Sequence, residues 1–266
     1  MQQRRRQILA AISSAIGYGL LDAKAFAASA PPKLGLIFPP ANRGVPEEGL
    51  AMYGNRIEYV TEGLGLETMT PEGYDAVIDR IPAVAKRLVA RGAQAVLLTG
   101  TSLTFYKGEA FNQKLTQIMR EAAGGLPVAT MSTAVIEGLK KMGAKRVVAP
   151  TAYNDEVNAR LRAFLTEHKF EVMGVQGMGI VAVEDINRVT QPQLLEFCTK
   201  VVKGAPKADT ILVSCGGLRT LEILAPLEAN TGLPAVTSMP HTLYAGAKLL
   251  GLDARVQGYG RLLASA

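Results

Sequence analysis

The sequence predicts an α/β protein with two pseudo-symmetric lobes, each a parallel four-stranded sheet flanked by helices, with an active site in the cleft between them. Short apolar runs alternate with longer helical patterns, which is typical of parallel sheets. The pattern also recurs, because the run at 96–100, VLLTG, resembles the run at 211–215, ILVSC, and aligning them places Gly100 opposite Cys215. We therefore expect a duplicated unit whose strand ends converge on one cleft.

Each apolar run of the first half is bounded by residues that end strands or begin helices. Strands are expected over 34–38, 57–65, 92–98 and 126–130, with a loop rich in glycine, proline and charge running to about residue 56. Thr70 and Pro71 suit the N-cap and first position of a helix, which we expect to continue, with a break near Pro82, to Arg91. Further helices are expected over 109–122 and 132–142, the second ended by Gly143.

The second half follows the same order. Strands are expected over 145–149, 172–175, 208–213 and 235–237, a helix over 157–168 after a loop that contains Tyr153, and another helix from near Arg219 or Thr220. We therefore assign residues 31–143 to a first lobe, completed by about residues 238–266, and residues 144–237 to a second lobe.

Residues 1–30 resemble an export signal. Three arginines at 4–6 precede a mostly apolar run over 9–21, and Ala28-Ser29-Ala30 offers a small-residue cleavage site. The arginines loosely match a twin-arginine signal. We expect export to the periplasm by such a signal or by a general one, whereas a mis-assigned N-terminus would leave the protein cytoplasmic. The apolar run is too short for a stable membrane span, and no other stretch qualifies.

Composition argues against several function classes. The net charge is +6, but residues 1–30 hold four basic residues and one acidic residue, so the remainder has 25 basic against 22 acidic residues, and we expect no nucleic-acid partner. Two histidines are too few and too scattered for a metal site. We expect His168 to be solvated, and His241 to have a capping or surface role, with lining of the cleft as the alternative. The oligomeric state is left open.

Cys215 is the leading candidate for chemistry. It ends an apolar strand and precedes Gly216 and Gly217, whose backbone N–H groups can approach a bound anion closely. Ligands bind outside the carboxyl ends of parallel strands, and a helix beginning soon afterwards would turn its positive end toward the thiol. This position favours a proton-transferring or nucleophilic cysteine, with a small core residue as the alternative. Cys198 follows an apolar helical pattern and is expected to fill the core.

Several further motifs occur in order along the chain: GLIFPP at 35–40, GLGL at 63–66 with TPEGYD at 70–75, GTSLTFY at 100–106, TMSTA at 130–134, TAY at 151–153, SCGGL at 214–218 and GYGRL at 258–262. Together they resemble the aspartate/glutamate racemase superfamily, and within it the arylmalonate decarboxylase family, over about residues 34–263. The family fold is two α/β lobes related by a pseudo-two-fold axis, with the active site between them, which agrees with the duplication.

The resemblance implies a cofactor-independent decarboxylase of disubstituted (aryl or alkenyl) malonates, with no metal or other cofactor. Loss of CO2 leaves an enediolate, which the resemblance assigns to the hydroxyls of Thr101, Ser102 and Tyr153 and to backbone N–H groups around Ser102 and Gly216. Cys215 would then donate a proton to the enediolate.

The resemblance also implies an apolar pocket for the departing carboxylate, where losing its charge is favoured. Its lining residues would be Pro39, Leu66, Met69, Val183 and Ile186. Gly100 would border the substrate in place of the first of the two cysteines that racemases and maleate isomerases carry. One proton donor on one face suits a decarboxylase.

Two other functions stay open. A racemase or maleate-type cis–trans isomerase of small dicarboxylates would need a second acid/base besides Cys215, such as Tyr153. An exported solute-binding protein also has two α/β lobes around a cleft, although a binding cleft needs no thiol at a strand end.

Overall fold

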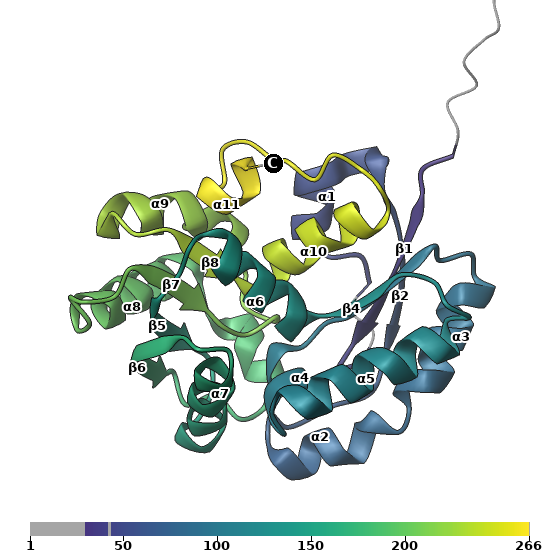
Figure 1. Cartoon of the computed structure of the whole chain (residues 1–266), viewed down its shortest axis with the longest axis horizontal. Coiled ribbons are helices and arrows are strands. Elements are labelled where there is room, and N and C mark those ends of the chain that lie inside the picture. The colour runs from purple at the N-terminus through teal and green to yellow at the C-terminus, as the bar shows by residue number, and fades with distance from the viewer. Residues whose placement is uncertain (1–29, 42–43, 266) are drawn as a thin grey trace, which may run out of the picture. The chain divides into compact units, whose positions relative to one another are not determined.

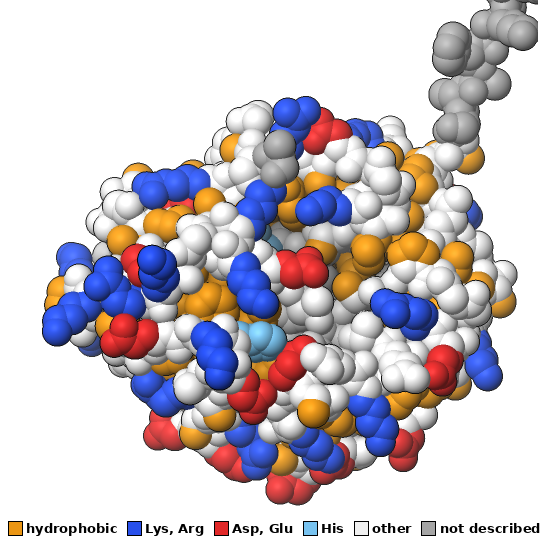
Figure 2. Space-filling model, in the orientation of Figure 1, with side chains coloured by type: hydrophobic (Ala, Val, Ile, Leu, Met, Phe, Trp, Pro, Cys, Tyr) orange, Lys and Arg blue, Asp and Glu red, His pale blue; other side chains and the backbone are white. Residues whose placement is uncertain are grey.

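The computed structural model describes residues 30–41 and 44–265 (Figure 1). The export signal predicted over residues 1–30 lies, apart from Ala30, outside the described residues. Within the described part of the chain, none of the helices is both long enough and apolar enough to span a bilayer. On the face shown in Figure 2, basic and acidic side chains are intermingled.

Two four-stranded parallel sheets form the two lobes. The first has the order β2-β1-β3-β4, built from β1 (Lys33–Phe38), β2 (Glu58–Gly63), β3 (Ala95–Leu98) and β4 (Val128–Thr130). The second has the order β6-β5-β7-β8, built from β5 (Arg146–Thr151), β6 (Glu171–Gly177), β7 (Thr210–Val213) and β8 (Ala235–Thr237). The two orders are equivalent, so the predicted fold class and duplication are confirmed.

Helices cover each sheet (Figure 1). In the first lobe α3 (Ile81–Ala90) packs on β1 and β2, and α5 (Glu109–Ala122) packs on β4. In the second lobe α7 (Asp155–Glu167), α8 (Gln191–Lys203) and α9 (Leu221–Thr231) pack on β6, β5 and β8 respectively. Two central helices, α6 (Met131–Lys141) and α10 (Ser238–Leu249), pack against each other, and α10 also contacts β3 and β4. The short α11 (Arg261–Ala264) packs against α10 and β8.

Local sequence signals explain these elements. Thr70 Oγ1 accepts a hydrogen bond from the Gly73 backbone N–H at 3.2 Å and so caps α2 (Pro71–Ile78), as predicted. The chain breaks at Asp79 before α3 begins. The central strands β3 and β7 are buried along their whole length, as their apolar runs require. Cys198 is fully buried in α8, where burial raises the pKa of its thiol to about 12, so its predicted place in the core is confirmed.

The loop predicted up to residue 56 is wrong in its second half. That segment forms α1 (Glu47–Tyr53) and a short 3₁₀ turn, Gly54–Arg56. Two glutamates in the first turn suit a helix N-terminus. Met52 and Tyr53 are buried, and the Tyr53 hydroxyl donates to the Ala254 carbonyl at 2.9 Å. Because this contact joins residues far apart in the chain, the local composition did not reveal the helix.

One of the two histidine predictions is wrong, and the other holds for one of its two alternatives. His168 is half-buried rather than solvated, with its ring Nε2 3.1 Å from Glu109 Oε2 and its ring edge-on to Phe164. His241 is buried rather than at the surface, and its Nδ1 lies 2.8 Å from the backbone of Thr237 at the start of α10. His241 therefore has the predicted capping role, inside the protein.

Candidate functional site

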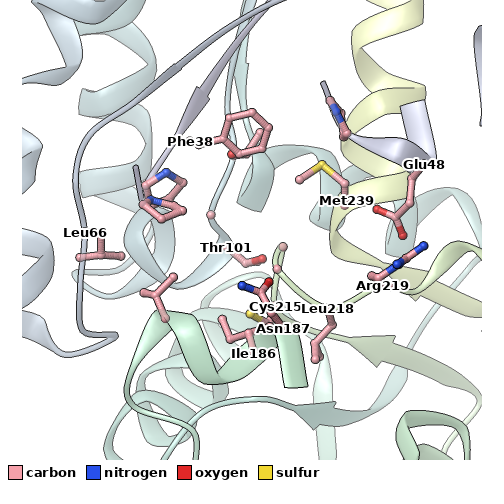
Figure 3. Close-up of a pocket in the computed structure, with 18 of the residues that line it drawn as sticks. Phe38, Glu48, Leu66, Thr101, Ile186, Asn187, Cys215, Leu218, Arg219 and Met239 are labelled. Carbon is pink, nitrogen blue, oxygen red and sulfur yellow. The ribbon is translucent and has the colours of Figure 1, made fainter. Parts of the chain in front are cut away.

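A cavity of about 330 Å³ lies between the lobes, at the carboxyl ends of β1, β3 and β7 and the start of α10 (Figure 3). Ten of the eleven residues predicted for the site line it: Pro39, Leu66, Met69, Gly100, Thr101, Ser102, Val183, Ile186, Cys215 and Gly216. The eleventh, Tyr153, is 1% exposed and lies outside the lining. The ends of the duplicated strands β3 and β7 thus place Gly100 and Cys215, which are 115 residues apart in the chain, at the same cavity.

The position two residues beyond β3 favours glycine. Gly100 has a φ of +107°, in the region that favours glycine, and a Cβ built on it would lie 2.2 Å from Pro39 Cγ. Pro39 follows β1, which pairs with β3 in register. The absence of a Cβ at Gly100 therefore lets the ends of β1 and β3 lie close together at the cavity wall.

Gly100→Ala is expected to destabilise the protein by roughly 2 kcal/mol or more, since it combines a strained φ with a backbone-anchored clash. Urea unfolding would measure this loss. Gly143→Ala is a matched control, because Gly143 has a φ of +70° but open space around its Cβ position. If Gly100→Ala and Gly143→Ala lose equal unfolding free energy, the clash with Pro39 adds nothing to the cost of the strained φ.

Cys215 lies two residues beyond β7, where it is 5% exposed and forms no disulfide. Its backbone N–H donates to Ser238 Oγ at 3.2 Å, and Ser238 Oγ lies 2.7 Å from Thr101 Oγ1. Since Ser238 Oγ already accepts from Cys215, its own proton can be given to Thr101 Oγ1. The Thr101 proton is then available to a group in the cavity.

The same arrangement recurs in the other lobe. Met131, the first residue after β4, accepts from the Gly100 backbone N–H through Sδ at 3.2 Å, as Ser238, the first residue after β8, accepts from Cys215. A Cβ on Gly216 would lie 2.8 Å from Met131 Sδ, so this glycine permits close packing across the lobes. The duplication therefore extends to how the two strand-end loops are held.

Two buried tyrosines stand behind the cavity wall. Tyr153 Oη lies 3.1 Å from Ser214 Oγ, next to Cys215 in the chain. Burial raises the pKa of Tyr153 well above its ordinary value, and the nearby Cys215 adds to this, so the phenol keeps its proton and can donate it in a hydrogen bond. Tyr74 is fully buried, and burial likewise raises the pKa of its hydroxyl, an effect that the Ser102 side chain partly offsets.

One wall of the cavity is apolar and joins the lobes. The Met69 backbone N–H donates to the Val181 carbonyl at 2.8 Å, and the Val183 N–H donates to the Glu67 carbonyl at 2.9 Å. This short antiparallel bridge brings Leu66 and Met69 together with the 3₁₀ turn Val183–Arg188, which carries Ile186. The predicted apolar residues therefore lie together, although they come from both lobes.

Another wall is polar. Glu48 and Arg219 lie on one side of the cavity in Figure 3, and Leu66 lies on the opposite side. Glu48 is 8% exposed, and its Oε1 accepts from the backbone N–H groups of Thr220 at 2.8 Å and Leu221 at 3.0 Å. The first N–H groups of α9 are therefore directed at Glu48, and the expectation that this helix end would serve the Cys215 thiol is wrong.

Burial raises the pKa of Glu48 from 4.5 to about 7, against the opposing effect of the two N–H groups. A raised folded-state pKa means that the folded protein holds this proton more tightly than the unfolded chain. Glu48 therefore contributes stability that is fully present below pH 4.5 and is lost as pH rises through about 7.

Over that interval the loss should reach about 3 kcal/mol. Unfolding of the wild type and of Glu48→Gln at several pH values would measure it, since the glutamine does not titrate. The difference in unfolding free energy between the two proteins should shift in favour of the glutamine variant between pH 4.5 and 7.5. A difference that stays constant over this range would contradict the raised pKa.

Sequence reasoning missed Glu48, Ser238 and Tyr74. The internal repeat could have indicated Ser238, because the runs at 126–128 and 233–235 align and place Ser238 opposite Met131. Tyr74 lies in the TPEGYD motif at 70–75, but the motif alone predicts no role for its hydroxyl. No local signal distinguishes Glu48 from its neighbour Glu47, whose side chain is exposed.

Comparisons with known proteins bear on this site. The family model described as arylmalonate decarboxylase matches residues 34–263. An arylmalonate decarboxylase of Bordetella bronchiseptica is 46% identical over 232 residues, covering 87% of this chain and 96% of that protein. A maleate isomerase of Geobacillus stearothermophilus is 23% identical over 222 residues, covering 82% of this chain and 86% of that protein.

Solved structures agree with these sequence matches. The crystal structure of a double mutant of arylmalonate decarboxylase in a liganded form is similar with a TM-score of 0.82 and 44% identity, covering 87% of this chain and 98% of that one. A maleate isomerase from Pseudomonas putida S16, solved with maleate, has a TM-score of 0.81 at 18% identity, covering 88% and 98% of the two chains, and shows the fold alone.

Proposed function

This chain belongs to the arylmalonate decarboxylase family, and from that premise we propose that it is a cofactor-independent decarboxylase of malonates that carry an aryl or alkenyl substituent. The observation that carries the proposal is the composition of one cavity. A strand-end thiol, a set of hydrogen-bond donors and an apolar wall all border the same space. These are the three features that decarboxylation followed by protonation on one face requires.

The donors suit the carboxylate that remains. Thr101 can direct its hydroxyl proton into the cavity if Ser238 Oγ, which accepts from the Cys215 N–H, donates its own proton to Thr101 Oγ1. Ser102 and Gly216 border the cavity, and their backbone N–H groups complete the set that we assign to the enediolate. Tyr153 supports them from behind through Ser214. Donors that are already fixed in place stabilise developing charge without reorganising during the reaction.

The apolar wall suits the carboxylate that leaves. A carboxylate placed against Leu66, Met69, Val183 and Ile186 loses its hydration, and the loss is relieved when it departs as neutral CO2. The bond between the α-carbon and this carboxylate breaks, and its electron pair passes into the enediolate. The Cys215 thiol then gives its proton to the α-carbon, and the resulting thiolate regains a proton from solvent.

The test is incubation of purified residues 31–266 with phenylmalonate in D2O, following CO2 release and the position of deuterium in the phenylacetate formed. A 2-methyl-2-phenylmalonate substrate would show the face of protonation, because its product is chiral. We expect CO2 release and a single product enantiomer. Interconversion of maleate and fumarate without CO2 release would favour the isomerase, and stoichiometric binding without turnover would favour a solute-binding protein.

A further inference from the structure

The loop that carries Cys215 is held at both ends by hydrogen bonds. At its start, the Ser214 N–H donates to the Pro150 carbonyl at 3.0 Å and the Cys215 N–H donates to Ser238 Oγ. In its middle, the Leu218 N–H donates to the Cys215 carbonyl at 3.2 Å and forms a tight turn. At its end, the Thr220 and Leu221 N–H groups donate to Glu48.

The last of these contacts comes from a distant part of the chain. Glu48 lies on α1, which follows the Pro39–Pro40 end of β1, and 172 residues separate it from Thr220. The same carboxylate therefore joins the loop after β1 to the loop after β7, and both loops border the cavity. Thr220, the N-cap residue of α9, makes no capping hydrogen bond with its own side chain, so Glu48 performs this task for it.

Burying a carboxylate costs free energy unless hydrogen bonds compensate, and a helix end could be capped by a residue of its own loop. The use of a buried carboxylate on the cavity wall therefore indicates a role beyond ending a helix. We propose that Glu48 is a positioning residue for Cys215, holding the far end of the Cys215 loop against α1 so that the thiol stays directed at the α-carbon of the substrate.

This inference rests on the proposed function for its catalytic readout. The strength of the contact depends on ionisation, because hydrogen bonds to a carboxylate are stronger than those to a carboxylic acid. The groups around Glu48 are Glu222, which raises its pKa, and Arg219, which lowers it, and Arg219 is itself paired with Glu47 at 2.5 Å. Burial makes ionisation of Glu48 costly to the fold as a whole, but the Thr220 and Leu221 N–H groups lower its pKa and therefore bind the ionised form more strongly. Because the pKa of Glu48 is about 7, this contact with the loop should be stronger above neutral pH than below it.

The experiment compares Glu48→Ala, Glu48→Gln and Glu228→Ala. Glu228 is a matched control, since it is 7% exposed and accepts from the backbone N–H groups of Ala235 at 2.9 Å and Arg261 at 3.0 Å, but lies outside the cavity lining. Glu228→Ala should lower the free energy of unfolding, as Glu48→Ala does. Glu228→Ala should nevertheless leave the Cys215 loop in place.

We expect Glu48→Ala to lower kcat by about 10- to 100-fold with KM changed less than about threefold, as for a reacting group displaced by about 1 Å. Glu48→Gln should recover most of kcat, because its amide oxygen still accepts from the loop. In the wild type, kcat should rise with pH through about 7, and Glu48→Gln should lack that rise. Glu228→Ala should keep both the wild-type kcat and its pH profile.

A second readout needs no decarboxylation. Iodoacetamide labelling followed by mass spectrometry measures the accessibility of Cys215, which is 5% exposed, against Cys198, which is fully buried. Glu48→Ala should label at Cys215 at least several-fold faster than the wild type, and Glu228→Ala should label at the wild-type rate. If Glu48→Ala behaves as Glu228→Ala in both readouts, or Glu48→Gln keeps the wild-type pH profile, the positioning role is wrong.

The two proposals fail separately. Faster labelling of Cys215 in Glu48→Ala, with no CO2 release by the wild type, would keep the positioning role and overturn the proposed function. CO2 release by the wild type, with kcat and the rate of Cys215 labelling unchanged in Glu48→Ala, would support the proposed function and overturn the positioning role.

Discussion

Cys215→Ala should lower the rate of CO2 release by about 10³-fold or more, because a positioned general acid contributes roughly 10²–10⁴-fold and this variant has no proton to give. The thiol borders the cavity, so its removal should change the free energy of unfolding by less than about 1 kcal/mol. Steady-state kinetics and urea unfolding of the same preparation would separate the two effects.

Cys198→Ala is the matched control for this variant. The substitution is the same, but Cys198 is fully buried in α8, away from the cavity. It should therefore lose about 1 kcal/mol of stability and keep the wild-type rate. Any residual product of Cys215→Ala should be a mixture of enantiomers, since water would protonate both faces. A wild-type rate in Cys215→Ala would contradict the assignment of the proton donor.

Thr101→Val is the second substitution with a large expected effect. Valine keeps the shape of threonine but removes the donor that we assign to the enediolate, and one such donor is worth about 10²–10³ in kcat. The loss should fall on kcat more than on KM, because the charge that Thr101 stabilises develops only as the carboxylate leaves.

Thr199→Val provides the comparison. Thr101 begins α4 (Thr101–Phe105), and Thr199 lies in α8. The Thr199 hydroxyl donates to the Leu195 carbonyl at 2.8 Å, away from the cavity lining. Its loss should leave kcat within about twofold, as expected for a substitution that touches no reacting atom. Equal kcat values for Thr101→Val and the wild type would show that the enediolate is stabilised without this hydroxyl.

The order of apolar runs and the internal repeat predicted the fold class, because whether a short segment is buried depends mainly on its own residues. Apolar runs such as 95–98 and 210–213 cannot avoid burial, and a parallel sheet buries both faces of its strands. The helix 109–122 and the strand 235–237 have the predicted bounds, and the other predicted strands end within about three residues of the observed ones. The residues beyond these strands could be located for the same reason, since parallel strands bring their carboxyl ends to one edge. Helix α1 was not predicted because its stabilising contacts are to distant residues. Tyr53 donates to the Ala254 carbonyl, and Glu48 accepts from Thr220.

By itself, the sequence determined that this protein is a duplicated α/β fold with one strand-end cysteine, Cys215, set against a glycine at the matching position. Only the tertiary structure decided how that cysteine is held. The hydrogen bonds of Ser238, the bridge between Met69 and Val181, and the contact of Glu48 with α9 all join segments that are distant in the chain. Each depends on how two lobes and their loops pack. The internal repeat can indicate the position of Ser238, but no period or motif shows which distant segment a residue will contact.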